Sequence, residues 1–138
     1  MSFDAGAVAR KLKLAAATSP AILGGEAATL AALAEVRGGP IADHVDGSHD
    51  WILLYADSRA ALDAALPGAA RALASPGTLW IAYPKGSSKR QTDLTRDQGW
   101  DAVKDVDLMW LTLVSIDDTW SAFSLRRYKP GEARQTFR

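Results

Sequence analysis

The sequence predicts a single α/β domain with a small three-layer Rossmann-like sheet, mostly parallel and with an antiparallel strand at its C-terminal edge. Two runs, 51–56 (WILLYA) and 78–83 (TLWIAY), are almost continuously apolar, as is typical of strands covered by helices on both faces. The segments between them space their apolar residues as helices do. Alternating strands and helices favour a parallel sheet with helices on both sides.

Composition limits the protein's partners. The 138 residues are 48% hydrophobic and 23% charged, which suits one globular domain over residues 1–138. Sixteen basic residues balance sixteen acidic ones, so no overall field attracts nucleic acid, and nucleic-acid binding is not expected. The absence of cysteine excludes disulfides, thiolate metal sites and cysteine nucleophiles. The first residues lack a secretory pattern and no apolar run is long enough to span a membrane, so a cytoplasmic protein is expected.

The N-terminal half predicts two helices and two short strands. A helix capped by Asp4 is expected to carry the first basic residues on its exposed side. The small-residue run 14–18 is a candidate for a buried strand that Pro20 stops. The segment 26–37 has helical spacing and ends at a Gly-Gly-Pro sequence, and 41–45 is a second short strand candidate.

The C-terminal half repeats the alternation. Asp57 or Ser58 is expected to cap a helix, in which Pro67 should cause a kink or a division into two short helices. After the next strand, Thr95 and Gln98 have the spacing of a capping box that begins another helix. The runs 109–116 and 120–128 are the last two strands, the final one with a drier and a wetter face.

The stretch 79–96 (LWIAYPKGSSKRQTDLTR) concentrates the chemistry of the chain. Its loop places Lys85, Ser87, Ser88, Lys89 and Arg90 close together before a predicted helix start, which favours an anion. If the preceding strand is parallel to its neighbours, this loop lies at the carboxyl edge of the sheet, where ligands bind in such folds. We therefore predict a site for a phosphate or carboxylate metabolite. No Walker A or GxGxxG motif is present, and the alternative is a solvated basic turn.

Charged residues on either side of this loop extend the candidate site. Asp93, Arg96 and Asp97 are expected either to orient Lys85 or, as the alternative, to provide a helix cap and a surface ion pair. Asp118 follows another apolar strand, where it would either face the lysine as a base or cation ligand, or simply form a tight turn.

Tryptophans and histidines are further candidate site residues. Trp120 adjoins polar motif residues and is included among the predicted ligand-binding residues, although core packing explains tryptophans in apolar runs. His44 and His49 have aspartates around them, but their spacing fits no zinc pattern and exposed loop histidines are commoner. We therefore predict no metal site.

Three motifs carry a resemblance to a known family. LWIAYPKGSSK (79–89), TDLTRD (92–97) and SIDDTWSAFSLR (115–126) resemble the signature of a family of small bacterial proteins classed as a domain of unknown function. Its members share a tryptophan-containing strand that runs into Tyr-Pro-Lys, an Asp-Leu-x-Arg-Asp segment and a closing Asp-x-Thr-Trp-Ser-Ala. The match covers residues 79–138, and the upstream half agrees only in its order of elements. The resemblance implies membership of this family, but no activity or cofactor.

Three classes of function follow. The first is a ligand-binding or regulatory domain that holds an anionic metabolite. The second is an interaction module or homodimer that uses an edge strand and tryptophans. The third is an enzyme on a trimmed methyltransferase-like sheet, with Lys85 and an aspartate as catalytic groups, which rests on fold analogy alone. The sequence leaves open whether the protein is an enzyme and identifies no cofactor.

Overall fold

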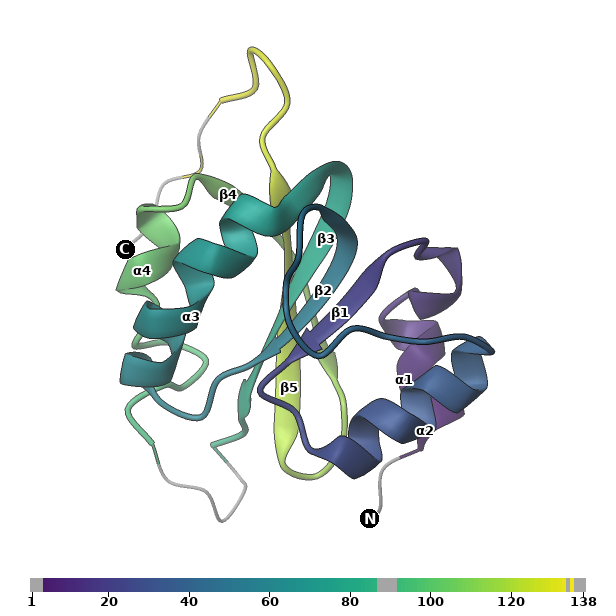
Figure 1. Ribbon diagram of the computed structural model, residues 1–138. Coiled ribbons are helices and arrows are strands. Elements are labelled where there is room, and N and C mark those ends of the chain that lie inside the picture. Colours follow the sequence, from purple (N-terminus) through teal and green to yellow (C-terminus); the bar gives the residue numbers. More distant parts are fainter. Residues whose placement is uncertain (1–3, 87–91, 134, 136–138) are drawn as a thin grey trace.

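A five-stranded mixed sheet forms the centre of the molecule (Figure 1). The computed structural model describes residues 4–86, 92–133 and 135. The strands are β1 (Pro20–Leu23), β2 (His49–Tyr55), β3 (Leu73–Pro84), β4 (Leu108–Ser115) and β5 (Trp120–Arg127), and their order in the sheet is β1-β2-β3-β5-β4. β1, β2 and β3 are parallel, and β5 is antiparallel to both β3 and β4. The predicted Rossmann-like α/β class is confirmed.

The C-terminal strand is antiparallel, as predicted, but it lies inside the sheet and β4 takes the edge. A short turn joins β4 to β5, which makes the two strands neighbours, while β5 also pairs with β3. β5 buries Ala122, Ser124 and Leu125, so it lacks the wetter face expected of an exposed strand. Because β4 is antiparallel to β5, it points the same way as β1, β2 and β3. The carboxyl ends of these four strands therefore share one edge of the sheet with the start of β5.

Helices cover both faces of this sheet, as expected. α1 (Ala5–Lys11) and α2 (Ala27–Arg37) lie on one side, and α3 (Arg59–Ala72) and α4 (Asp101–Lys104) lie on the other (Figure 1). Each side has its own buried apolar cluster, which the alternating side chains of the strands supply. The buried Trp51 indole donates to the carbonyl of Leu12 over 2.8 Å, which fixes the chain after α1 against β2.

The first strand begins later than predicted. Leu14–Ala16 forms a single 3-10 turn, and β1 starts at Pro20, so the prediction of a strand over 14–18 is wrong. Alanine is a poor strand former, whereas Ala21, Ile22 and Leu23 follow the proline. Proline is tolerated at the first residue of an edge strand because its missing N–H removes no essential ladder bond. The candidate strand at 41–45 is reduced to one isolated bridge between Ala21 and Ala42.

Two helix predictions also need correction. α3 is one continuous helix through Pro67, because its buried side chains, including Leu62 and Leu66, hold both halves on the same sheet face. The proline itself faces solvent. The helix expected from Thr95 begins only at Asp101. The Thr95 N–H donates forward to the carbonyl of Gln98 at 3.0 Å, a turn bond that is incompatible with a helix starting there.

Candidate functional site

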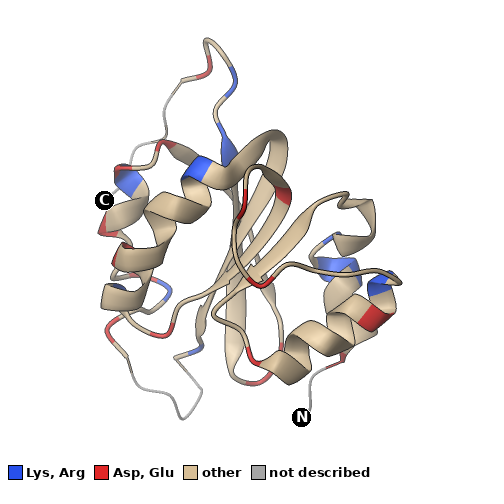
Figure 2. Ribbon diagram, in the orientation of Figure 1, with Lys and Arg blue, Asp and Glu red and all other residues tan. Residues whose placement is uncertain are grey.

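A small cleft opens at the shared carboxyl edge of the sheet, between the ends of β1 and β2 and the turn that joins β4 to β5. It encloses about 180 Å³. We call it the rim cleft. Its lining comes from three separate segments of the chain: Gly24, Gly25, Glu26, Thr29, Tyr55, Asp57, Asp117 and Trp120. Figure 2 shows that acidic positions predominate along this edge.

The glycine pair after β1 lets the backbone pass close to β2. Gly24 has a φ of +74°, and a Cβ at this position would lie 2.8 Å from the carbonyl oxygen of Tyr55. A Cβ on Gly25 would come within 3.2 Å of the Tyr55 ring. Only glycine fits the first position without strain. The chain can therefore turn directly from the end of β1 into α2 and bring Glu26 to the cleft.

Tyr55 and Trp120 form the aromatic wall of the cleft. Their ring centroids lie 4.9 Å apart with the planes at 88°, the edge-to-face arrangement that aromatic quadrupoles favour. Burial raises the pKa of the Tyr55 phenol above its ordinary value, and the negative charges of Asp117 and Glu26 raise it further. The phenol therefore stays protonated at neutral pH, and its surroundings are negative in potential.

The turn between β4 and β5 is held by the carboxylate of Asp117. Its Oδ1 accepts the backbone N–H groups of Thr119 at 2.8 Å and Trp120 at 2.9 Å. Such local bonding is the reason that aspartate favours tight turns. Asp117 lines the cleft, whereas the predicted ligand residue Asp118 is exposed beside it.

Lys85 extends from the end of β3 toward the same turn. Its backbone N–H donates to the Thr119 carbonyl at 2.7 Å, and its Nζ donates to Ser115 Oγ at 2.7 Å. The lysine thus lies at the carboxyl edge of a strand that is parallel to β2, as the sequence predicted. The three other predicted loop residues, Ser87, Ser88 and Lys89, lie outside the described residues, as does Arg90.

The remaining charged candidates, Asp93, Arg96 and Asp97, form structural contacts and do not line the rim cleft. Asp93 accepts the N–H of Arg59 at 2.8 Å, so it helps to cap the start of α3 rather than the helix that follows it in sequence. The cap expected at Asp57 or Ser58 comes from Ser58, whose Oγ accepts the N–H of Ala61 at 3.0 Å. Arg96 pairs with Asp97 at 3.4 Å in an exposed ion pair, which is the structural alternative stated for both residues.

The two histidines have separate environments. His44 is exposed and pairs with Asp43 at 2.8 Å. His49 is buried, which corrects the expectation of an exposed loop histidine: its Nε2 accepts the N–H of Asp46 at 3.0 Å, and its Nδ1 lies 3.0 Å from the Ser19 carbonyl. Among residues 4–86, 92–133 and 135, no group of three His, Asp or Glu side chains is arranged to hold a metal ion.

Sequence reasoning missed most of the cleft's lining. The sequence did not point to Glu26, Tyr55 or Asp57 as site residues, although each stands at or just past the end of a strand or its connecting turn. The position of Asp57 directly after the apolar run 51–56 was the available signal. Tyr55 and Asp117 come together only through the strand order, which periodicity does not determine.

Solved structures with a similar fold include methyltransferases. The ribosomal protein L11 methylase from Lactobacillus delbrueckii subsp. bulgaricus superposes with a TM-score of 0.51 at 14% identity, over 90% of this chain and 66% of that one. PigF, solved with SAH, gives 0.65 at 11% identity, over 90% of this chain and 60% of its own. The TehB-like SAM-dependent methyltransferase from Corynebacterium glutamicum gives a TM-score of 0.52 at 13% identity, over 88% of this chain and 87% of that one.

These likenesses define the class of fold, an α/β Rossmann-like sheet of the methyltransferase type. The chain spans less than two thirds of the first two of these proteins. No protein-family model matches the chain, and no curated protein matches it significantly. The resemblance of 79–138 to the small bacterial family therefore stays a prediction. In the part of the chain that the structure describes, no helix has the length and hydropathy that a membrane crossing requires.

Proposed function

We propose that this protein is a small-molecule-binding domain whose ligand belongs to the S-adenosyl class and binds at the rim cleft. The observation that carries the proposal is the set of three carboxylates, those of Glu26, Asp57 and Asp117, around the Tyr55–Trp120 pair. In open α/β sheets, ligands bind at the carboxyl ends of the strands, which is where these groups lie.

The charge of the cleft favours hydroxyl donors and cations over anions. Carboxylates accept hydrogen bonds from hydroxyl groups, as an acidic residue does from the ribose of a dinucleotide in related sheets. They also attract a sulfonium or ammonium group. An S-adenosyl amino acid carries a ribose diol and cationic groups, so its chemistry matches the cleft better than that of a phosphate ion.

Lys85 offers the complementary charge for the same ligand. It lies at the end of β3 and is tied to Ser115 and Thr119 beside the turn that lines the cleft. The carboxylate of an amino-acid ligand would be attracted to this ammonium group. In this proposal, the anion that the sequence predicts at Lys85 is the carboxylate of a ligand that also carries positive charge.

The size of the cleft limits how much of the ligand it encloses. Its 180 Å³ is below the roughly 300 Å³ of a typical complete ligand pocket. The cleft therefore suits a sugar-sized portion of the ligand, with the remainder lying along the edge of the sheet. The fold shared with SAM-dependent methyltransferases supports this class of ligand.

Isothermal calorimetry and thermal shift with S-adenosylmethionine, S-adenosylhomocysteine, ATP and inorganic phosphate test the proposal. At about 100 times its dissociation constant, a true ligand adds about 2.7 kcal/mol to the free energy of unfolding. We expect this from the S-adenosyl compounds and not from phosphate. A response to phosphate alone would support the original anion-site hypothesis instead.

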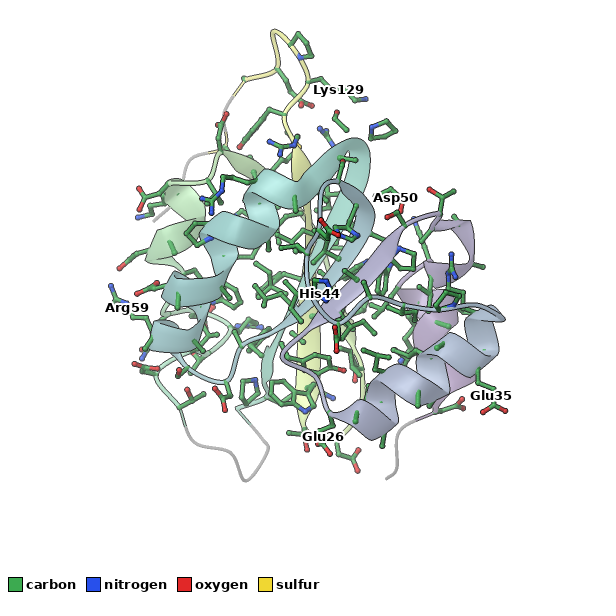
Figure 3. The ribbon with its side chains drawn as sticks, in the orientation of Figure 1. Glu26, Glu35, His44, Asp50, Arg59 and Lys129 are labelled. Carbon is green, nitrogen blue, oxygen red and sulfur yellow. The ribbon has the colours of Figure 1, made fainter. Side chains whose placement is uncertain are left out.

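Glu26→Gln provides the matched test, with Glu35→Gln as its control. Both glutamates belong to the α2 segment and are exposed, but Figure 3 shows them at opposite ends of the helix, with only Glu26 near the cleft. Glu26→Gln should weaken binding about tenfold or more through loss of a charged acceptor, while Glu35→Gln should not. Equal affinities for both variants and the wild type would place the ligand elsewhere.

Methyl transfer is the second candidate function. The match to a SAM-dependent methyltransferase over 87% of that protein favours it, because so little of the other chain is left unmatched. Production of S-adenosylhomocysteine from S-adenosylmethionine in the presence of candidate acceptors is the direct measurement. Binding without turnover would identify a binding domain, as proposed.

A further inference from the structure

A second and larger concavity lies along the edge strand β4, on the sheet face that carries α3 and α4. It encloses about 490 Å³, within the range of small-molecule pockets. We call it the aromatic groove. Trp100, Trp110 and Phe123 line it and pack against the apolar cluster of this face. Trp120 of the rim cleft packs against the cluster of the other face, so the two concavities are separate.

The aromatic residues form a preorganised apolar surface. The Trp110 and Phe123 centroids lie 4.7 Å apart, and Trp100 lies 5.3 Å from each of them, all three pairs being edge to face. The Trp100 indole donates to the Thr95 carbonyl at 2.5 Å, which fixes its ring. An apolar surface of ring faces and edges with little conformational freedom suits an aromatic ligand, whose ring can pack against either.

Two leucines leave this surface open to solvent. Leu111 is 46% exposed and Leu113 is 42% exposed, and both line the groove. Large apolar side chains exposed together beside an aromatic surface are typical of binding sites. The short α4 leaves this part of β4 uncovered.

The hydrogen-bonding edge of β4 is already occupied at Trp110. The side chain of Gln135 accepts from the Trp110 N–H at 2.8 Å and donates to its carbonyl at 3.0 Å, as a neighbouring strand would. The Gln135 N–H in turn donates to the Tyr128 hydroxyl at 2.9 Å. A peptide that added a strand to this edge would have to displace these bonds, so the groove favours a small molecule over an extended peptide or a second copy of the sheet.

Four charged residues in the described part of the chain line the groove, and three of them form ion pairs. Arg96 pairs with Asp97, and Asp101 pairs with Arg59 at 2.6 Å. Lys104, the last residue of α4, also lines the groove, and its side chain has no hydrogen bond or ion pair within residues 4–86, 92–133 and 135. An exposed apolar surface beside an uncompensated ammonium group is complementary to a molecule with an apolar ring and one negative charge.

We propose that the aromatic groove binds a planar aromatic carboxylate, with its ring on the Trp100, Trp110 and Phe123 surface and its carboxylate toward Lys104. This site is independent of the S-adenosyl ligand proposed for the rim cleft, and either proposal can fail alone. The recognition rests on ring burial for affinity and on a single charge for selectivity.

Titration with 2-naphthoate, followed by the indole N–H resonances of the five tryptophans in proton–nitrogen NMR spectra, tests the proposal. Trp100→Phe and Trp110→Phe assign the two expected signals. We expect 2-naphthoate to shift these two resonances and to bind about tenfold more tightly than 2-naphthylmethylamine, which has the same ring and the opposite charge. Equal binding of both probes, or shifts at other tryptophans only, would overturn the proposal.

Comparing Lys104→Gln with Lys13→Gln distinguishes the effect of the Lys104 charge at the groove from that of lowering the net charge of the protein by one. Both remove one exposed lysine charge, but Lys13 lies after α1, outside the lining of the groove. Lys104→Gln should abolish the preference for the carboxylate probe, and Lys13→Gln should keep it. Light scattering completes the test: a dimer that dissociates in Leu113→Asp, with no naphthoate binding, would show that the groove is an interface between copies of the chain and overturn the proposal.

Discussion

The rings of Tyr55 and Trp120 meet edge to face across the carboxyl edge of the sheet, 4.9 Å apart at their centroids. Tyr55 ends β2 and Trp120 begins β5, and β3 lies between these strands. The contact therefore reaches across β3. It joins the parallel part of the sheet to the β4–β5 hairpin at the point where the rim cleft opens.

Replacing Trp120 should weaken both the fold and the cleft. We expect Trp120→Ala to lower the free energy of unfolding by about 2 kcal/mol, less than for a fully buried tryptophan because the ring is only half-buried. Urea denaturation followed by circular dichroism measures this change. Trp120→Phe should recover most of the loss, since it keeps an edge-to-face partner for Tyr55. An alanine variant as stable as the wild type would show that the ring has no structural role.

Gly24→Ala should be strongly destabilising, and Gly47→Ala provides its control. Both glycines have similar positive φ values, +74° and +78°, but a Cβ at Gly47 would meet nothing within 4 Å, whereas at Gly24 it would lie 2.8 Å from the Tyr55 carbonyl. The left-handed backbone alone costs an alanine about 1 to 2 kcal/mol. We expect Gly47→Ala to cost that amount and Gly24→Ala clearly more, by chemical denaturation. Equal losses would mean that the clash relaxes at no cost.

The sequence predicted β2, β3, β4, β5 and the longer helices because their signals are local. The runs at 51–56 and 78–83 are apolar at nearly every position, and they became the two central parallel strands β2 and β3. Because these two strands are parallel, Lys85 lies at the carboxyl edge of the sheet, as the sequence predicted on that condition. The helix over 26–37 was marked by its spacing and by the Gly-Gly-Pro that follows, and α2 ends at Arg37.

The remaining features depend on contacts between distant segments. Nothing local shows that β5 inserts between β3 and β4, yet that insertion brings Trp120 to Tyr55. Pro67 was expected to interrupt its helix, but the packing of both helical halves on the sheet outweighs the missing backbone bond. The acidic character of the cleft likewise arises from three carboxylates that are far apart in the chain.

Lys85→Ala should leave the unliganded protein nearly as stable as the wild type. The side chain of Lys85 forms an exposed hydrogen bond to Ser115, and such contacts contribute less than about 1 kcal/mol. The same variant should weaken the binding of a carboxylate-bearing ligand at the rim cleft, as measured by calorimetry. Unfolding of the variant would instead assign Lys85 a structural role and remove it from the proposed site.

Asp50 is expected to stabilise the protein by holding the two residues that precede β1. Its carboxylate accepts the backbone N–H groups of Thr18 at 2.8 Å and Ser19 at 2.9 Å, and the Thr18 hydroxyl at 3.0 Å. We expect Asp50→Ala to cost about 2 kcal/mol, by denaturant titration. Asp63→Ala is the control, because its 4.0 Å ion pair with Arg59 is exposed and should contribute less than about 1 kcal/mol. Equal effects would contradict the anchoring role.

The same anchor gives the stability a defined pH dependence. Burial raises the pKa of Asp50, but the hydrogen bonds from Thr18 and Ser19 outweigh burial and lower it below its ordinary 3.8. A carboxyl group whose pKa is lower in the folded state stabilises the protein above the unfolded-state pKa. This stabilisation should be lost as the pH falls below 3.8. The unfolding free energy of Asp50→Asn should therefore depend less on pH in that range than that of the wild type.

Glu132 offers a direct check on the turn that follows β5. Its hydrogen bonds from Arg126, at 2.8 and 2.9 Å, and from the Lys129 N–H lower its pKa from 4.5 to about 2. The folded-state pKa is depressed, so this contact stabilises the turn above pH 4.5 and is lost as the pH falls toward 2. Carbon-detected NMR titration of the Glu132 carboxyl measures the pKa. Arg126→Gln should return it toward 4.5, and a wild-type value already near 4.5 would show that the pair does not persist in solution.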